Sequence, residues 1–298
     1  AATPPVAAVF AILTKVGAYT LMRLWLLLFG AQAGAAAQFG GDMLLFGGMA
    51  TIAFGTLAVL ASRDLARLGA YSVLVSSGTV LAAVGMGQSN VTGGALFYLV
   101  SSTLGLSAFF LLVELVERGR EPGADGVAVT RETYGEGEDE TIDEAEDVGI
   151  PIPATLAILG LAFIASAVII AGLPPLSGFI AKFALLSAAL KPPQGNTVSI
   201  AAWSLLGLLI ISGLAALIAL TRAGIHAFWD LPERDVPRVG LVEIAPVAAL
   251  ILLCALLTLQ AGSVMRFAQA TAQSLHEPRQ YIRGVLGSAD GVRPKEAR

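Results

Sequence analysis

Two lysines stand inside long apolar stretches of the sequence, where a charged side chain is costly. Lys15 lies in the run FAILTKVGAYTLMRLW and Lys182 in the run AGLPPLSGFIAKFALL. A lysine at the centre of a membrane helix costs about 2.5–3.5 kcal/mol on insertion scales, so its presence is by default a hypothesis of function. A buried lysine can lose and regain a proton near physiological pH. We therefore expect Lys15 and Lys182 to carry protons or exchange with cations.

The composition indicates that these lysines belong to an integral membrane protein made of helices. Of the 298 residues, 56% are hydrophobic and 13% are charged, and the mean hydropathy is +0.77. A soluble domain has about 25% charged residues. The sequence contains no Cys/His metal cluster, phosphate-binding loop, dinucleotide-binding glycine motif or nucleophile triad. We therefore expect no metal, cofactor, catalytic residue or nucleic-acid partner, and a membrane protein that is not an enzyme.

Seven apolar segments are candidates for membrane helices, which need about 20 mostly apolar residues each. They are Val6–Phe29, Met43–Ala61, Leu65–Gly87, Thr92–Glu117, Pro153–Leu190, Thr197–Thr221 and Leu241–Gly262. The fifth would be roughly 55 Å long as one straight helix, against a hydrocarbon core of about 30 Å. The sequence therefore predicts an all-α transmembrane bundle of about seven helices, with one broken helix.

The break is predicted at GLPPLSG, shortly before Lys182. The expected hinge residues are Gly172, Pro174, Pro175, Ser177 and Gly178, because proline removes a backbone donor and glycine relaxes the backbone. Unwound backbone at membrane depth is tolerated only inside protein or beside a watery cavity, and broken helices mark ion sites in secondary transporters. The alternative is a simple proline kink with Lys182 snorkelling to an interface.

Hydroxyl groups on the third and fourth segments are candidates for a relay between the lysines. The residues are Ser76 and Ser77 on one segment and Ser101 and Ser102 on the next. Together with water they could pass protons from one lysine to the other. The alternative is that these small polar residues serve helix packing, as they often do in membranes.

The loops suggest an orientation in the membrane. Basic residues follow the second, fourth and sixth segments, whereas AQAGAAAQFGG and GMGQSNVTGG carry none. Short basic loops stay in the cytoplasm, so the C-terminal tail would lie outside, although it too is basic. Residues 114–150 hold thirteen acidic and three basic side chains, a composition typical of a solvated cytoplasmic linker. The alternative is a cation-attracting antenna.

The chain opens with Ala1 almost directly into an apolar segment, and no signal peptide precedes that segment. We therefore expect a fragment or a processed chain.

Several stretches resemble the C-terminal half of one membrane subunit, the D type, of the Mrp (Pha) multisubunit monovalent cation/proton antiporters. The stretches, in order, are ATPPVAAVFAILTKVGAYTLMRLW, SRDLARLGAYSVLVSSG, GALFYLVSSTLGLSAFFLLVEL, AGLPPLSGFIAKFALL and TRAGIHAFW. The resemblance covers about residues 2–265. The family is homologous to the antiporter-like subunits of respiratory complex I.

The resemblance implies helices 8 to 14 of a fourteen-helix subunit that has two inverted five-helix repeats. It implies that Lys15 and Lys182 are the family's helix 8 and helix 12 lysines, and that the proton and cation pathway depends on them. Where many relatives have His or Gln, this sequence has Ser76, and a frequent His is replaced by Ser101 or Ser102. The implied divisions are 1–29 (last helix of the first repeat), 42–224 (second repeat, with an acidic loop at 118–150), 240–265 (final helix) and 266–298 (polar tail).

The function implied is that of a membrane subunit of a Na⁺(K⁺)/H⁺ antiporter in a bacterial inner membrane. The implied partners are other membrane subunits of the complex, monovalent cations, protons and the lipid bilayer. The rival is a proton-translocating subunit of a redox complex, either complex I or a membrane-bound hydrogenase, because the motifs are shared across that superfamily. The sequence does not discriminate among Na⁺, K⁺ and Li⁺.

Overall fold

The computed structural model describes residues 3–31, 33–118, 154–191, 197–228 and 241–277, and these residues form helices without any strand. The helices are α1 (Thr3–Phe29), the short 3₁₀ helix η1 (Gly34–Ala36), α2 (Gly41–Ala61), α3 (Leu65–Gly85), α4 (Ser89–Arg118), α6 (Ala154–Ala171), α7 (Ser177–Ala189), α8 (Ile200–Phe228), α9 (Leu241–Leu259) and α10 (Ala261–His276). The predicted all-α class is confirmed.

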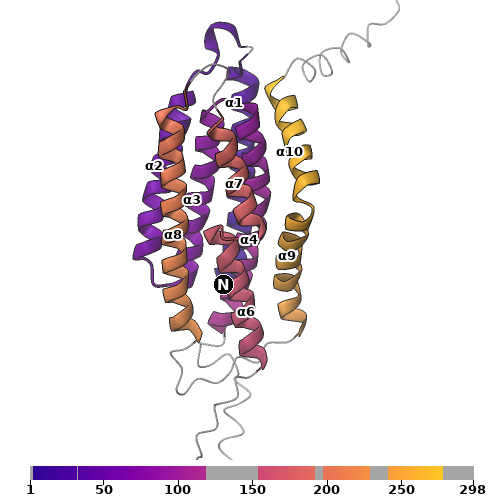
Figure 1. Ribbon diagram of the computed structural model, residues 1–298. Helices are drawn as coiled ribbons and strands as arrows, with labels where there is room; N and C mark the ends of the chain where they lie inside the picture. The colour runs from indigo at the N-terminus through magenta and orange to yellow at the C-terminus, as the bar shows by residue number, and fades with distance from the viewer. Residues whose placement is uncertain (1–2, 32, 119–153, 192–196, 229–240, 278–298) are drawn as a thin grey trace, which may run out of the picture.

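Five of these helices, α1, α2, α3, α4 and α8, are each long and apolar enough to cross a membrane. The predicted fifth segment is divided into α6 and α7, which are too short to span separately and follow one another along the bundle (Figure 1). The pair α9–α10 passes the same test when the two helices are taken together, and the pair is bent by 83° at the break between them. The predicted broken helix is therefore present, and a second interruption occurs at Gln260.

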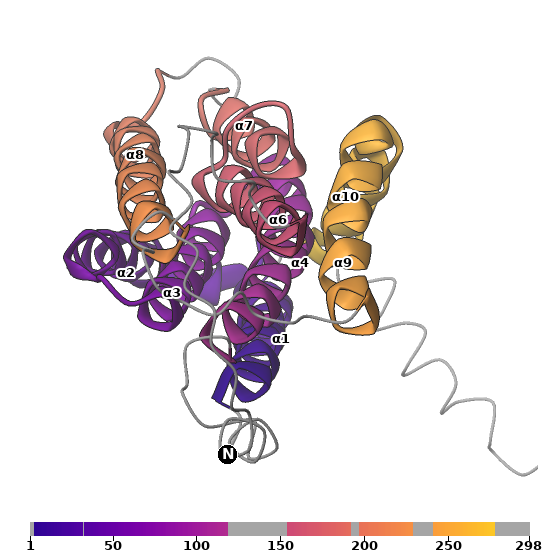
Figure 2. The ribbon, with the colours of Figure 1, turned by 90° about the horizontal axis from the view of Figure 1, so that it is seen from below.

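Helix α4 occupies the centre of the bundle. It packs against α1, α3, α6, α7, α9 and α10, and Figure 2 shows it between the α2–α3–α8 group and the α9–α10 pair. Its partner α3 is also largely buried. The two helices that were predicted to carry the relay hydroxyls therefore lie in the interior.

Small residues let α2 and α3 approach closely. A Cβ atom added to Gly78 would lie 2.8 Å from the carbonyl oxygen of Gly48 and 3.0 Å from Thr51 Cβ. Side chains larger than hydrogen would push the helices apart, as at other small-residue contacts between membrane helices. The close contact fixes where the hydroxyl groups of α3 lie relative to α2.

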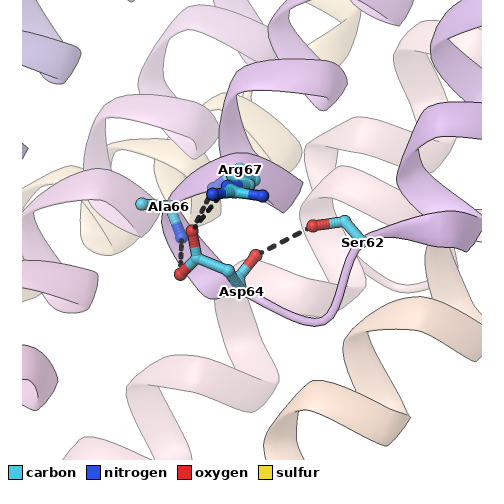
Figure 3. Close-up of polar contacts among 4 residues, drawn as sticks. All are labelled: Ser62, Asp64, Ala66 and Arg67. Carbon is cyan, nitrogen blue, oxygen red and sulfur yellow. Dashed lines mark hydrogen bonds and ion pairs between the residues drawn. The ribbon is translucent and has the colours of Figure 1, made fainter.

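The turn between α2 and α3 is held by polar contacts (Figure 3). Asp64 caps α3 by accepting hydrogen bonds from the backbone N–H groups of Ala66 and Arg67, both at 3.4 Å, which satisfies two otherwise unpaired donors. The Arg222 guanidinium of α8 donates to the carbonyls of Leu60 at 2.7 Å and Ser62 at 2.5 Å. A cation at the C-terminus of α2 also complements the helix dipole, so α8 is fastened to the α2–α3 turn.

The ends of the helices lie alternately at the two ends of the bundle. The α2–α3 turn, the end of α4, the start of α6 and the end of α8 lie at the lower end in Figure 1, whereas α10 ends at the upper end. The described basic residues Arg63, Arg67 and Arg222 thus share one end, as the loop pattern predicts. Assignment of that end to the cytoplasm stays a prediction, and residues 119–150 of the acidic segment lie outside the described residues.

The C-terminal boundary differs from the prediction. The polar tail was placed at 266–298, but α10 continues to His276 and packs along α4. Ala268 and Ala272 are buried, and Thr92 Oγ1 lies 3.0 Å from His276 Nε2. The helix is amphipathic rather than uniformly apolar, and a search for apolar runs therefore ends before it.

Candidate functional site

The break between α6 and α7 begins with a regular helix ending. Gly172 has φ of +76°, a left-handed conformation that suits glycine. Its N–H donates to the Ile169 carbonyl at 3.2 Å, and the Leu173 N–H donates to the Val168 carbonyl at 3.0 Å. These two bonds make a Schellman motif. They satisfy the carbonyls of Val168 and Ile169 but not those of Ile170 and Ala171.

The tandem prolines explain why those two carbonyls have no backbone N–H donor. Pro174 and Pro175 stand four residues after Ile170 and Ala171, at the positions whose N–H groups would bond these carbonyls in a continuing helix. Proline has no N–H to donate. The sequence thus exposes two adjacent backbone acceptors at the C-terminal end of α6, where the helix dipole is negative.

Lys182 supplies the missing donor. Its Nζ lies 2.8 Å from the Ala171 carbonyl oxygen and 3.4 Å from that of Ile170. The side chain turns back from α7 across Gly172, where an added Cβ would lie 2.6 Å from Lys182 Cδ. The Lys182 side chain therefore folds back onto the break and ends at its backbone carbonyls.

Lys15 reaches the same region from α1. The side chain is 2% exposed, and its Nζ donates a short hydrogen bond to Ser76 Oγ on α3. Ser76 in turn donates to the Val73 carbonyl at 2.8 Å. Lys15 is thus joined to α3 through one of the predicted relay hydroxyls.

A small cavity of about 30 Å³ lies beside Lys182 and reaches Ser76, the hydrogen-bond partner of Lys15, with room for about two water molecules. Its lining comes from α2, α3, α4, α6, α7 and α8. It includes the predicted residues Ser76, Ser101, Ser102, Gly178 and Lys182, together with Thr56, Ser72, Tyr98 and Ser212.

The other predicted residues have different positions. Ser77 is buried and donates to the Val73 carbonyl at 2.9 Å, but it does not line the cavity. Pro174 and Pro175 are exposed and do not line the cavity. Ser177 is buried at the start of α7 and accepts a hydrogen bond from Ser101 at 2.9 Å, so it joins α4 to the break.

Thr56 of α2 and Ser212 of α8 are cavity residues on helices from which the sequence analysis named no site residue. Each is an isolated hydroxyl in an otherwise apolar stretch, and only the packing of α2, α3 and α8 brings them to the cavity. Their hydroxyl groups donate to their own helices, at 2.7 Å to the Ile52 carbonyl and 2.9 Å to the Leu209 carbonyl.

This hydrogen-bonding pattern gives the cavity its chemical character. Ser72 and Ser102 also donate to carbonyls of their own helices, those of Leu68 at 2.8 Å and Leu99 at 3.2 Å. A hydroxyl that has used its one donor can only accept further hydrogen bonds. The cavity therefore presents mainly oxygen acceptors, and Lys182 is the cation beside them.

Comparison with known proteins assigns the family. A model of the family described as NADH:quinone oxidoreductase/Mrp antiporter, TM, matches residues 1–209, a range that contains both lysines and the helix break. The chain belongs to this family. The predicted resemblance is thereby confirmed.

A probable K⁺/H⁺ antiporter D subunit of Rhizobium meliloti (strain 1021) is similar to this chain, with 56% identity over 291 residues. The match covers 97% of this chain and 54% of that protein. The Na⁺/H⁺ antiporter D subunit of Bacillus subtilis (strain 168) is 28% identical, over 93% of this chain and 50% of that protein. The chain spans about half the length of these curated relatives.

Solved structures share the fold. The Mrp complex from Dietzia sp. DQ12-45-1b matches with a TM-score of 0.68 and 20% identity, over 94% of this chain and 55% of that chain. An archaeal membrane-bound sulfane sulfur reductase matches with a TM-score of 0.69 and 17% identity, over 94% and 51%. Respiratory complex I from Thermus thermophilus with bound NADH matches with a TM-score of 0.63 and 22% identity, over 88% of this chain and 49% of that chain. The chain is accordingly a multi-pass membrane protein with the antiporter-like fold.

Proposed function

We propose that this chain is part of the D-type membrane subunit of a multisubunit monovalent cation/proton antiporter in a bacterial inner membrane. It carries one portion of the pathway along which protons and Na⁺ or K⁺ cross, and it assembles with other membrane subunits. No covalent bond is made or broken. The chemistry is the vectorial movement of charge.

The observation that carries this proposal is the pair of intramembrane lysines around one hydroxyl-lined cavity. Lys15 contacts the cavity through Ser76, and Lys182 lines it directly. The two amines differ in their partners, because one meets a hydroxyl and the other meets backbone carbonyls. Water in the cavity can link them, so that a proton leaves one amine as another arrives at its neighbour.

The name of the Rhizobium meliloti relative supports antiport over redox-driven pumping. The likeness to complex I and to the sulfane sulfur reductase concerns the fold alone, at 22% and 17% identity. No contact of the described residues specifically favours a redox partner.

The proposal is tested by replacing Lys182 in the full-length protein, expressed with its complex in everted membrane vesicles. We expect Lys182→Ala to abolish the collapse of the pH gradient that Na⁺ or K⁺ addition causes, while the complex still assembles. Lys191→Ala is the matched control, because Lys191 lies exposed just beyond the end of α7. Wild-type exchange by Lys182→Ala would overturn the assigned role of this lysine.

A further inference from the structure

We propose that the carbonyls of Ile170 and Ala171, which the prolines leave without a backbone donor, form a binding site for a dehydrated monovalent metal cation, and that the Lys182 ammonium occupies this site as a tethered substitute. The inference rests on the proposed function and specifies where the metal cation binds. The cavity hydroxyls complete the site, and Gly172 and Gly213 give access to it.

The first argument is the chemistry of the acceptors. Two adjacent carbonyls, freed by the prolines that follow them, point toward one positive group at 2.8 Å and 3.4 Å. Alkali cations in proteins are bound by backbone carbonyl oxygens that replace their hydration shell. Unwound carbonyls and the C-terminal ends of half-helices serve this purpose in other transporters. An ammonium bound to such carbonyls marks a place suited to a single positive charge.

The second argument is the surrounding space and its polarity. The cavity beside Lys182 holds about 30 Å³, enough for about two water-sized species. Thr56, Ser72, Ser102 and Ser212 have each directed their donor to their own helix. These hydroxyl groups therefore present oxygen acceptors to the cavity, and a metal cation requires such acceptors. A cluster of hydrogen-bond donors pointing into the cavity would not bind a metal cation.

The third argument is the absence of side chains at two points of closest approach. Gly172 leaves room for the Lys182 stem. On α8, a Cβ added to Gly213 would lie 2.9 Å from the Ala171 carbonyl oxygen and 3.6 Å from Lys182 Nζ. A methyl group there would cover the acceptor and hinder a metal cation from reaching it. Gly207, almost two turns earlier in α8, has nothing within 4 Å of an added Cβ.

The exchange step then balances in charge. Lys182 gives its proton to water in the cavity, and the neutral amine no longer needs the carbonyls. A metal cation takes the place of the ammonium, so that one positive charge leaves as one arrives. The reverse step releases the metal cation when the amine is protonated again. One site thus serves both ions in turn, and simultaneous occupancy is opposed by repulsion.

Other titratable groups lie on the helices around α7, and the test must distinguish their protonation from that of Lys182. Tyr98 of α4 lines the cavity, Lys15 contacts it through Ser76, and Cys254 is a buried residue of α9, which packs on α7. Glu114, Arg222 and His226 lie on α4 and α8 but do not line the cavity.

The test measures equilibrium binding of ²²Na⁺ and ⁸⁶Rb⁺ to the purified full-length protein over a range of pH, with proton release recorded in weakly buffered solution. For the wild type we expect about one proton to be released for each cation bound. The apparent Kd for the cation should fall by up to tenfold for each unit by which the pH rises. Lys182→Ala should bind the cation at least as tightly, with no pH dependence and no proton release, although it no longer supports exchange.

The two glycine variants supply the matched comparison. Gly213→Ala should weaken cation binding at least tenfold, and Gly207→Ala should leave it within twofold of the wild type. Loss of cation binding in Lys182→Ala, or equal binding by the two glycine variants, would overturn the inference. Persistence of the pH dependence in Lys182→Ala would also overturn it, since another group would then control the site. The proposed function fails separately, if Lys182→Ala exchanges normally in vesicles.

Discussion

At the scale of single residues, the two lysines have contrasting surroundings. A protonated lysine has three N–H donors. Lys182 directs its ammonium to two carbonyls at the negative end of a helix, which favours the charged form. Lys15 is buried, and among the described residues its hydrogen bond goes to the hydroxyl of Ser76. Lys182 is therefore anchored to backbone acceptors at the helix break, whereas Lys15 is joined to α3 through a side-chain hydroxyl.

This difference gives a prediction for Lys15→Arg. Arginine keeps the positive charge but does not release it in proteins. We expect the variant complex to assemble and its cation-dependent exchange to fall at least tenfold in everted vesicles at every pH from about 6 to about 9, the region in which a buried lysine can exchange its proton. The exposed Lys191→Arg is the control for the same chemical change. If Lys15→Arg matches the wild type throughout, Lys15 provides only a fixed charge.

At the scale of helices, the central feature is the interrupted pair α6–α7. The Schellman ending at Gly172 and the two following prolines end α6 at a point where Lys182, one and a half turns into α7, can reach back to it. Gly178 lies directly against the Ile169 carbonyl, so the start of α7 packs tightly on the end of α6. The break is a defined structure rather than a loose hinge.

Replacement of Gly172 tests this arrangement. In Gly172→Ala, the left-handed conformation costs about 1–2 kcal/mol, and the new Cβ would lie 2.9 Å from Lys182 Nζ. We expect a lower thermal unfolding midpoint of the purified full-length protein and exchange reduced at least fivefold. Gly160→Ala in α6 meets nothing within 4 Å and should retain both properties. Equal midpoints and rates for the two variants would show that the shape of the break is unimportant.

The sequence predicts these elements to different extents. Long apolar runs give α2 and α3 within about two residues of their observed bounds, and the Gly-Pro punctuation locates the break. The bend at Gln260 was missed, because this glutamine is not a helix breaker and α10 is amphipathic. Thr56 and Ser212 were missed for a different reason. A hydroxyl flanked on both sides by apolar residues has no distinctive sequence signal, and only the approach of α2 and α8 to α3 brings it to the cavity.

At the scale of the whole molecule, α4 joins the parts that must act together. Ser101 and Ser102 bring α4 to the cavity, and Ser101 also contacts Ser177 of α7. Further along, Phe109 of α4 packs on Phe163 of α6, with ring centroids 6.1 Å apart. The same helix therefore contacts the cavity and, at its other end, leads into the acidic segment that follows Arg118.

This arrangement bears on the acidic segment, which was predicted from its charge to be either a solvated linker or an electrostatic antenna. Because α4 and α6 pack directly against each other and their connected ends lie at the same end of the bundle (Figure 1), a much shorter connection could join them. The free-energy cost of closing a flexible loop depends only weakly on its length, about 0.6 kcal/mol per doubling. Deletion of residues 121–149 with a short Gly/Ser replacement should therefore leave folding and assembly intact.

We expect this deletion variant to exchange within about twofold of the wild-type rate, with an unchanged apparent KM for Na⁺ or K⁺. The segment carries eleven acidic residues between Glu121 and Asp147, so an antenna would raise the local concentration of cations at the lower end of the bundle. Its effect would be screened as the ionic strength rises, since the Debye length falls from about 30 Å at 0.01 M to about 3 Å at 1 M.

The measurement is the apparent KM in everted vesicles at low and high ionic strength, with the ionic strength set by an impermeant organic salt. A variant that keeps the length but replaces the acidic residues by Gln and Asn separates charge from length. The linker interpretation would be contradicted, and the antenna established, by one pattern: both variants have a higher apparent KM than the wild type at low ionic strength, and all three proteins have the same KM at high ionic strength.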